Sequence, residues 1–182
     1  MDKVVQQEPL AGRRYASSGI SLETAPFCER IALRAAPDAI VPIGKKIGIS
    51  IPVKPKTSKI LKKITALWLG PDEWLILAPV GSGLAGQFAG LDGLLFSAVD
   101  VSHRNTAIYI EGTQAASTLN AGCPQDLSIT AFPKGACSRT ILGKSEIILH
   151  REAHERFRIE CWRSFSDYVW NFLVDAGKSA QL

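Results

Sequence analysis

Five side chains suited to acid–base or ligand-binding chemistry lie in the second half of this 182-residue chain. They are Asp100, Ser102, His103, Arg104 and Asp126. A carboxylate, a hydroxyl, an imidazole and a guanidinium together could bind a polar small molecule or transfer a proton. Asp and Ser are equally suited to turns and caps, where their side chains accept hydrogen bonds from the backbone. The residue types alone leave both interpretations open.

His103 and Cys123 are also the residue types that form a thiol nucleophile and its base. Such a pair needs an orienting carboxylate, for which Asp100 and Asp126 are the candidates, and an oxyanion site. Cysteine, however, is among the most buried residue types and usually acts as a small hydrophobic group. We therefore assign no catalytic residue to the chain.

A glycine-rich segment resembles a nucleotide-binding loop in its spacing. Gly81, Gly83 and Gly86 match the pattern G-x-G-x-x-G, whose backbone N–H groups can hold a pyrophosphate. The helix that would follow is interrupted by Gly90 and Gly93, and no further β-α-β units follow. We therefore favour a surface connection over a dinucleotide site.

His150 and His154 have a spacing that could hold a metal ion if they lay on a helix. They fall between two strand-like runs, which favours a hairpin turn with solvated histidines. The four cysteines form no C-x-x-C pair, so a zinc or redox motif has no support. We expect neither a metal site nor a cofactor bound by this chain.

The composition indicates an ordinary globular protein, with 46% hydrophobic and 21% charged residues and a net charge of +4. The densest basic stretch, Lys54–Lys63, contains no aromatic residue, so we expect a solvated loop and no nucleic-acid site. No stretch approaches the roughly 20 apolar residues that cross a bilayer, and the first residues lack a secretory signal. We therefore expect a cytoplasmic protein with reduced thiols and no membrane partner.

The elements that must position these residues are mostly short strands. Alternating apolar residues and turn residues between them predict strands at 31–34, 44–53, 64–69, 74–78, 95–101, 106–111, 138–142, 147–149 and 156–162. Short helices are predicted at 84–91 and 113–120 and at the end of the chain. Because strands and helices do not alternate strictly, we expect an α+β fold with largely antiparallel sheet. Residues 1–17 lack periodicity, and we expect a frayed tail there.

The last predicted helix contains a candidate contact to another protein. Phe165, Tyr168, Val169 and Phe172 recur at helical spacing and predict one apolar face. At about 100° per residue, Trp170 falls off this face. Tryptophan is enriched among residues that dominate protein interfaces, so we predict a partner contact at Trp170. An isolated exposed aromatic residue is the alternative.

Several short segments between Leu67 and Leu173 carry a resemblance to a known family. They are Trp68–Leu75 (WLGPDEWL), Val99–Arg104 (VDVSHR), Gly122–Leu127 (GCPQDL), Phe132 with Gly135, Arg139 with Thr140, and Arg163–Trp170 (RSFSDYVW). In these segments and their order the chain resembles the gamma subunit of heterotetrameric sarcosine oxidase. The first and last segments are the most specific.

This resemblance implies distant kinship with folate-binding aminomethyltransferases and with tRNA-modification folate domains. It therefore implies two small α+β lobes in tight contact, for which we take residues 18–93 and 94–182. It also implies alpha, beta and delta partner subunits, in a complex that oxidatively demethylates sarcosine to glycine. The products include hydrogen peroxide and formaldehyde, or methylene-tetrahydrofolate when tetrahydrofolate is present. FAD, FMN and NAD are then carried by the alpha and beta subunits.

On this basis we expect a non-catalytic subunit that acts through its surfaces and can self-associate when isolated. Asp100, His103, Arg104 and Arg139 then serve as lobe-fixing ion pairs and caps. The alternative is a stand-alone folate or small-molecule binding protein, or an aminomethyltransferase-like enzyme. Its pocket would lie at the five polar residues named first.

Overall fold

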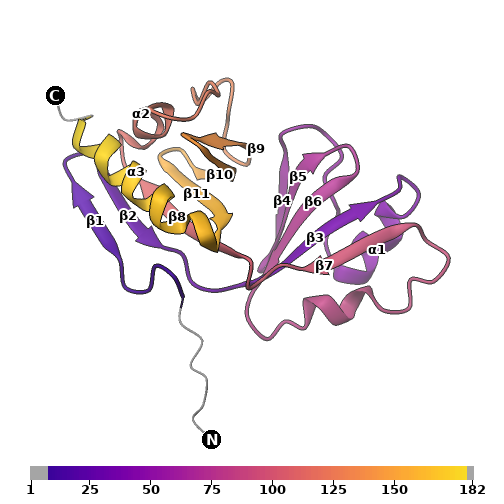
Figure 1. Ribbon diagram of the computed structural model, residues 1–182. Coiled ribbons are helices and arrows are strands. Elements are labelled where there is room, and N and C mark those ends of the chain that lie inside the picture. Colours follow the sequence, from indigo (N-terminus) through magenta and orange to yellow (C-terminus); the bar gives the residue numbers. More distant parts are fainter. Residues whose placement is uncertain (1–7, 180–182) are drawn as a thin grey trace, which may run out of the picture.

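The computed structural model describes residues 8–179, which form two antiparallel sheets and short helices (Figure 1). The larger sheet contains, in spatial order, β1 (Arg14–Ser17), β2 (Ile20–Thr24), β8 (Asn105–Glu111), β11 (Arg156–Trp162), β10 (Ser145–Ala153) and β9 (Cys137–Leu142). The smaller sheet contains β4 (Ser58–Leu61), β5 (Ile64–Gly70), β6 (Glu73–Ala78), β3 (Glu29–Ala35) and β7 (Phe96–Asp100). The predicted α+β class with antiparallel sheets is confirmed.

Helices cover one face of each sheet. They are α1 (Ile40–Ile47), α2 (Ala115–Asn120) and α3 (Ser166–Ser179), with 3₁₀ segments η1 (Leu84–Phe88) and η2 (Arg163–Phe165). Leu119 of α2 and Leu173 of α3 share a core with the larger sheet, whereas Ile43 of α1 and Phe88 of η1 share one with the smaller sheet. A third apolar cluster, which includes Leu67 and Ile148, joins the two sheets. Each sheet therefore has a core of its own, and the third cluster holds the two lobes together.

The two lobes do not divide at residues 93 and 94. Strand β2 pairs with β8, so β1 and β2 complete the larger, mainly C-terminal sheet. Strand β7 pairs with β3 and closes the edge of the smaller sheet. The expected tail likewise contains a strand at residues 14–17; residues 1–7 of that tail lie outside the described residues. The chain therefore crosses between the lobes twice, at residues 25–28 and 101–104.

The predicted strand at 44–53 is wrong. Residues up to Ile47 belong to α1, in which Ile43 and Ile47 are one turn apart and both buried. Gly48 then ends the helix with a left-handed backbone (φ 76°). Ile49 and Ile51 are buried in the segment that follows. The apparent period of two spans the end of α1 and the segment after it, because the isoleucines of both enter the same core.

Candidate functional site

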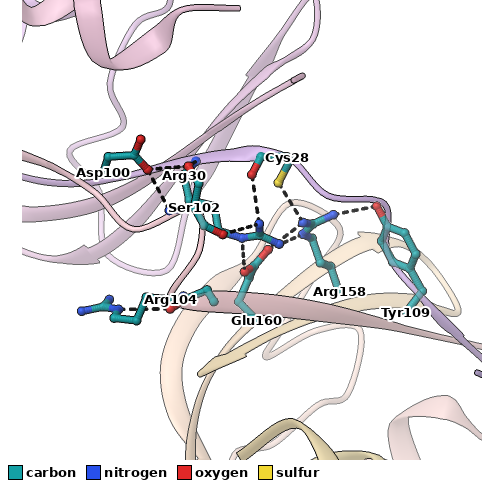
Figure 2. A network of polar contacts seen from close by, with 9 residues as sticks. Cys28, Arg30, Asp100, Ser102, Arg104, Tyr109, Arg158 and Glu160 are labelled. Atoms are coloured by element: carbon teal, nitrogen blue, oxygen red, sulfur yellow. Dashed lines mark hydrogen bonds and ion pairs between the residues drawn. The ribbon is translucent and has the colours of Figure 1, made fainter. Parts of the chain in front are cut away.

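Four of the five polar residues lie where the chain returns from the smaller to the larger sheet. Three of them, Asp100, Ser102 and Arg104, are labelled in Figure 2. Asp100 Oδ1 accepts hydrogen bonds from the Ser102 backbone N–H (2.8 Å) and hydroxyl (2.5 Å). The Ser102 hydroxyl oxygen in turn accepts a bond from the Arg30 backbone N–H (2.9 Å). These two bonds from Ser102, helped by the charge of His103, lower the pKa of Asp100. Asp100 and Ser102 therefore fix the turn of the crossing against β3.

His103 and Arg104 are exposed beside this turn. The His103 ring stacks on Phe27, which belongs to the other crossing segment, with ring centres 5.1 Å apart. Arg104 donates to Asn105 Oδ1 (3.2 Å) and lies over the Trp162 ring. The two residues thus tie the two crossings to each other and to β11.

Asp126 and Cys123 lie elsewhere, in the segment between α2 and β9. Asp126 Oδ1 accepts the backbone N–H of Ser128 (2.8 Å), an ordinary turn contact. Cys123 is buried in the core of the larger lobe, with its sulfur 3.9 Å from the Thr140 hydroxyl. The structure gives Cys123 and His103 separate neighbours and does not pair them as nucleophile and base.

A buried ionic network, which the sequence patterns do not predict, lies between the lobes (Figure 2). Glu160 of β11 accepts a bond from Arg30 Nε of β3 at one oxygen (2.7 Å). Its other oxygen accepts a hydrogen bond from Arg158 Nε (2.8 Å) and lies 2.6 Å from Arg158 Nη2. All three side chains are buried. A carboxylate of one sheet is therefore shared between guanidinium groups of both sheets.

The remaining donors of the two arginines are directed to Cys28 at the first crossing, to Ser102 at the second and to Tyr109 of β8. Arg30 Nη1 donates to the Cys28 carbonyl oxygen (3.0 Å), and Arg158 donates to the Tyr109 hydroxyl (2.8 Å) and the Cys28 sulfur (3.4 Å). Burial opposes ionisation of Arg158, but the charge of Glu160 raises the pKa of Arg158 overall. Burial raises the pKa of the Cys28 thiol despite both nearby arginines. A raised pKa disfavours the thiolate, which is the nucleophilic form of cysteine.

A second ion pair bridges the lobes near their surface. Arg139 of β9 binds Glu73 of β6 through both guanidinium Nη groups, one at 3.0 Å from Glu73 Oε2. The hydrogen bonds from Arg139 lower the pKa of Glu73. Arg139 therefore joins the two lobes as expected, with Glu73 as its partner.

The glycine-rich loop has a protein carboxylate where a phosphate would lie. Glu29 of β3 accepts hydrogen bonds from the Ser82 hydroxyl (2.7 Å), Leu84 N–H (2.7 Å) and Gly83 N–H (3.2 Å). Desolvation opposes the effect, but these bonds keep the pKa of Glu29 below its usual value. The donors that could hold a pyrophosphate therefore hold the chain's own side chain.

The two histidines lie in different environments. His154 is exposed as expected, but His150 is 2% exposed because β10 continues to Ala153 and turns His150 toward the other lobe. His150 Nε2 lies 3.1 Å from the Ser58 hydroxyl, and burial together with the charge of Arg158 lowers the pKa of His150 to about 4. Among residues 8–179, no cluster of three or more His, Cys, Asp or Glu could hold a metal ion.

The prediction that Trp170 lies off the buried face of the last helix, and is exposed, is wrong. Trp170 is 6% exposed and packs in the core of the larger lobe with Val169 and Leu173. The helix turns this stripe toward the sheet, which leaves Phe165 and Tyr168 exposed. The predicted apolar face and the face that is buried share Val169. Helical periodicity alone could therefore not decide which of the two faces packs on the sheet.

The basic stretch Lys54–Lys63 is only partly a loop, because Ser58–Leu61 within it form β4. No helix in the described part of the chain has the length and hydrophobicity that a membrane span requires.

Comparison with known proteins relates the chain to one family. Residues 33–180 match the sarcosine oxidase, gamma subunit family. Sarcosine oxidase subunit gamma from Arthrobacter sp. is 27% identical over 164 residues, which cover 88% of this chain and 81% of that protein. The subunit gamma from Corynebacterium sp. (strain U-96) is 28% identical over 171 residues, which cover 92% and 82%.

Two solved structures resemble this fold. One is heterotetrameric sarcosine oxidase from Corynebacterium sp. U-96 in complex with pyrrole 2-carboxylate: one chain matches with a TM-score of 0.88 and 25% identity, covering 96% of this chain and 95% of that chain. The other is glycine cleavage system aminomethyltransferase T from Bartonella henselae, with a TM-score of 0.64 and 16% identity. That match covers 86% of this chain and 45% of the transferase and shows a shared fold.

Proposed function

Because this chain belongs to the sarcosine oxidase gamma subunit family, we propose that it is the non-catalytic gamma subunit of a sarcosine oxidase heterotetramer. Alpha, beta and delta subunits complete the complex, which oxidatively demethylates sarcosine to glycine. Hydrogen peroxide and formaldehyde, or methylene-tetrahydrofolate, are the other products. FAD, FMN, NAD and tetrahydrofolate are bound by the partner subunits.

The observation that carries the proposal is the agreement over nearly the whole chain with a chain of a heterotetrameric sarcosine oxidase. The contacts of the polar residues support the non-catalytic role. Glu160, Asp100 and Glu29 each accept hydrogen bonds from groups of this same chain. Side chains that stabilise the fold in this way have few lone pairs left for a substrate.

Co-expression with the three partner subunits tests the proposal. We expect a stoichiometric complex that contains flavin and forms hydrogen peroxide from sarcosine. The chain expressed alone is expected to be colourless and inactive in the same assay. Sarcosine turnover or tightly bound flavin in the isolated chain would overturn the proposal.

A second candidate function is a small-molecule binding protein, favoured by the transferase-like fold and by a cavity of about 340 Å³. This cavity lies beside the ionic network and is lined by Phe27, Tyr109 and Arg158 among others. Tetrahydrofolate titration of the isolated chain tests it. Saturable binding that weakens in Lys63→Ala, which changes the cavity lining, supports this function, whereas no binding at millimolar ligand removes it.

A further inference from the structure

A groove of about 660 Å³ lies between α1 and β4 on the smaller lobe. Val41, Val53 and Leu61 line it and are 63%, 64% and 45% exposed. They come from the helix, from the segment after it and from the strand at the edge of the sheet. Apolar side chains that converge on one hollow from three segments are typical of a binding surface.

The fold of the smaller lobe builds the floor of this groove. A Cβ atom at Gly44 would lie 2.8 Å from the Ile49 carbonyl oxygen, so only glycine lets the chain fold back so closely on α1. This return brings Ile49 and Ile51 beneath the groove, where both are buried. The hollow is thus a fixed feature of the packed lobe and not a gap beside a loose loop.

The segment that forms the groove carries charge of only one sign. From Ala39 to Pro71 the chain contains no Asp, Glu or Arg and has seven lysines. They are Lys45, Lys46, Lys54, Lys56, Lys59, Lys62 and Lys63.

One of these lysines lines the groove, and two others are close in sequence to its lining residues. Lys45 lines it, Lys54 follows Val53, and Lys59 is two residues from Leu61 on the same face of β4. Within residues 8–179, none of the three forms a salt bridge. The rim therefore presents unpaired positive charge around an apolar floor.

We propose that this groove binds an acidic amphipathic segment of a partner subunit. The apolar face of that segment fills the groove, and its carboxylates pair with the lysine rim, as in other helix-in-groove and rim-and-core interfaces. A second copy of this chain is a poor occupant, because two lysine rims would face each other. The inference rests on the proposed function, since it needs a partner subunit.

Charge reversal tests the rim. Lys45→Glu/Lys59→Glu is compared with Lys134→Glu/Lys144→Glu, which makes the same charge change at two exposed lysines of the larger lobe. Affinity of the full chain for the assembled partner subunits is measured at low and high salt. We expect the groove variant to bind roughly tenfold more weakly and to lose most of the salt dependence. The control variant should stay within about twofold of wild type.

Apolar truncation and cross-linking test the floor and the occupant. Val41→Ser/Leu61→Ser is expected to weaken binding by about tenfold or more, and Ile129→Ser/Ile141→Ser, also exposed, to change it little. Carbodiimide joins amines directly to carboxylates. In the complex it should couple Lys45, Lys54 or Lys59 to one acidic segment of a partner.

The outcomes separate this inference from the proposed function. If wild type assembles and both groove variants bind as tightly as wild type, the groove is not the docking site, although the gamma role stands. If the isolated chain forms a dimer that Val41→Ser/Leu61→Ser dissociates, a second copy is the occupant and the inference is wrong. If wild type forms no complex at all, both proposals fail. Unchanged melting temperatures of the variants show that they are folded.

Discussion

Replacing Glu160 by glutamine removes the one carboxylate that two buried guanidinium groups share. Glu160 and Arg30 are each 1% exposed, and Arg158 is nearly as buried. Glutamine keeps the shape of the side chain but leaves both positive charges without a counter-charge between the sheets. The Tyr109 hydroxyl and the Cys28 carbonyl oxygen still accept bonds, but neither carries a negative charge.

The size of the loss follows from this burial. Removing one partner of a buried ion pair typically costs about 3–5 kcal/mol, because the remaining charge is desolvated and unpaired. For a domain of this length, 1 kcal/mol lowers Tm by about 2–4 °C. We therefore expect Glu160→Gln to lower Tm by roughly 6–20 °C. Asp72→Asn is the control, because Asp72 and Arg34 are both exposed and 3.9 Å apart; it should cost under about 1 kcal/mol.

Urea unfolding followed by tryptophan fluorescence measures both free energies. A triple variant, Arg30→Met/Arg158→Met/Glu160→Met, removes all three charges together and should be more stable than Glu160→Gln. If Glu160→Gln unfolds within about 1 kcal/mol of wild type, the network does not hold the lobes together as argued.

Three further predictions concern buried or strained positions. His150 has a folded-state pKa of about 4, below its ordinary 6.5, so its contribution to stability is complete above pH 6.5 and is lost as the pH falls toward 4. His150→Gln should remove up to about 3 kcal/mol of this pH dependence, measured by urea unfolding at each pH. Trp170→Ala should cost about 3–5 kcal/mol of stability, and a loss below about 1 kcal/mol would contradict its place in the core. Gly112 has φ 132°, and a Cβ there would lie 2.2 Å from the Gly19 carbonyl oxygen. Gly112→Ala should therefore lower the free energy of unfolding by more than about 2 kcal/mol in urea. An unchanged free energy of unfolding would refute the close approach.

Local signals in the sequence predict much of the fold. The hairpin of β5 and β6 follows from two apolar runs around Gly70 and Pro71, and the last three strands follow from alternation between turn residues. Pairing between distant segments has no such signal. Strand β2 pairs with β8 and β7 with β3 because each completes a sheet, which no local pattern of Leu22 or Ala98 records.

The candidate site, like the fold, could be predicted from the sequence only in part. The crossing at Asp100–Arg104 could be located because its polar residues are dense in one short run. The ionic network could not, since Arg30 is 130 residues away from Glu160 along the chain. One signal was present: Arg158 and Glu160 alternate with buried Phe157 and Ile159 in β11, which indicates a polar face turned toward another layer. Only the packing of the two sheets shows that this face is covered.

The central claim is that the chemically reactive residue types of this chain join its lobes and take no part in turnover. Sarcosine-dependent peroxide formation per bound flavin, measured in the assembled complex, tests it most directly. With His103→Ala/Arg104→Ala in this chain, we predict the same kcat as wild type. A fall of about tenfold or more in a complex that retains all its subunits and flavin would contradict the claim.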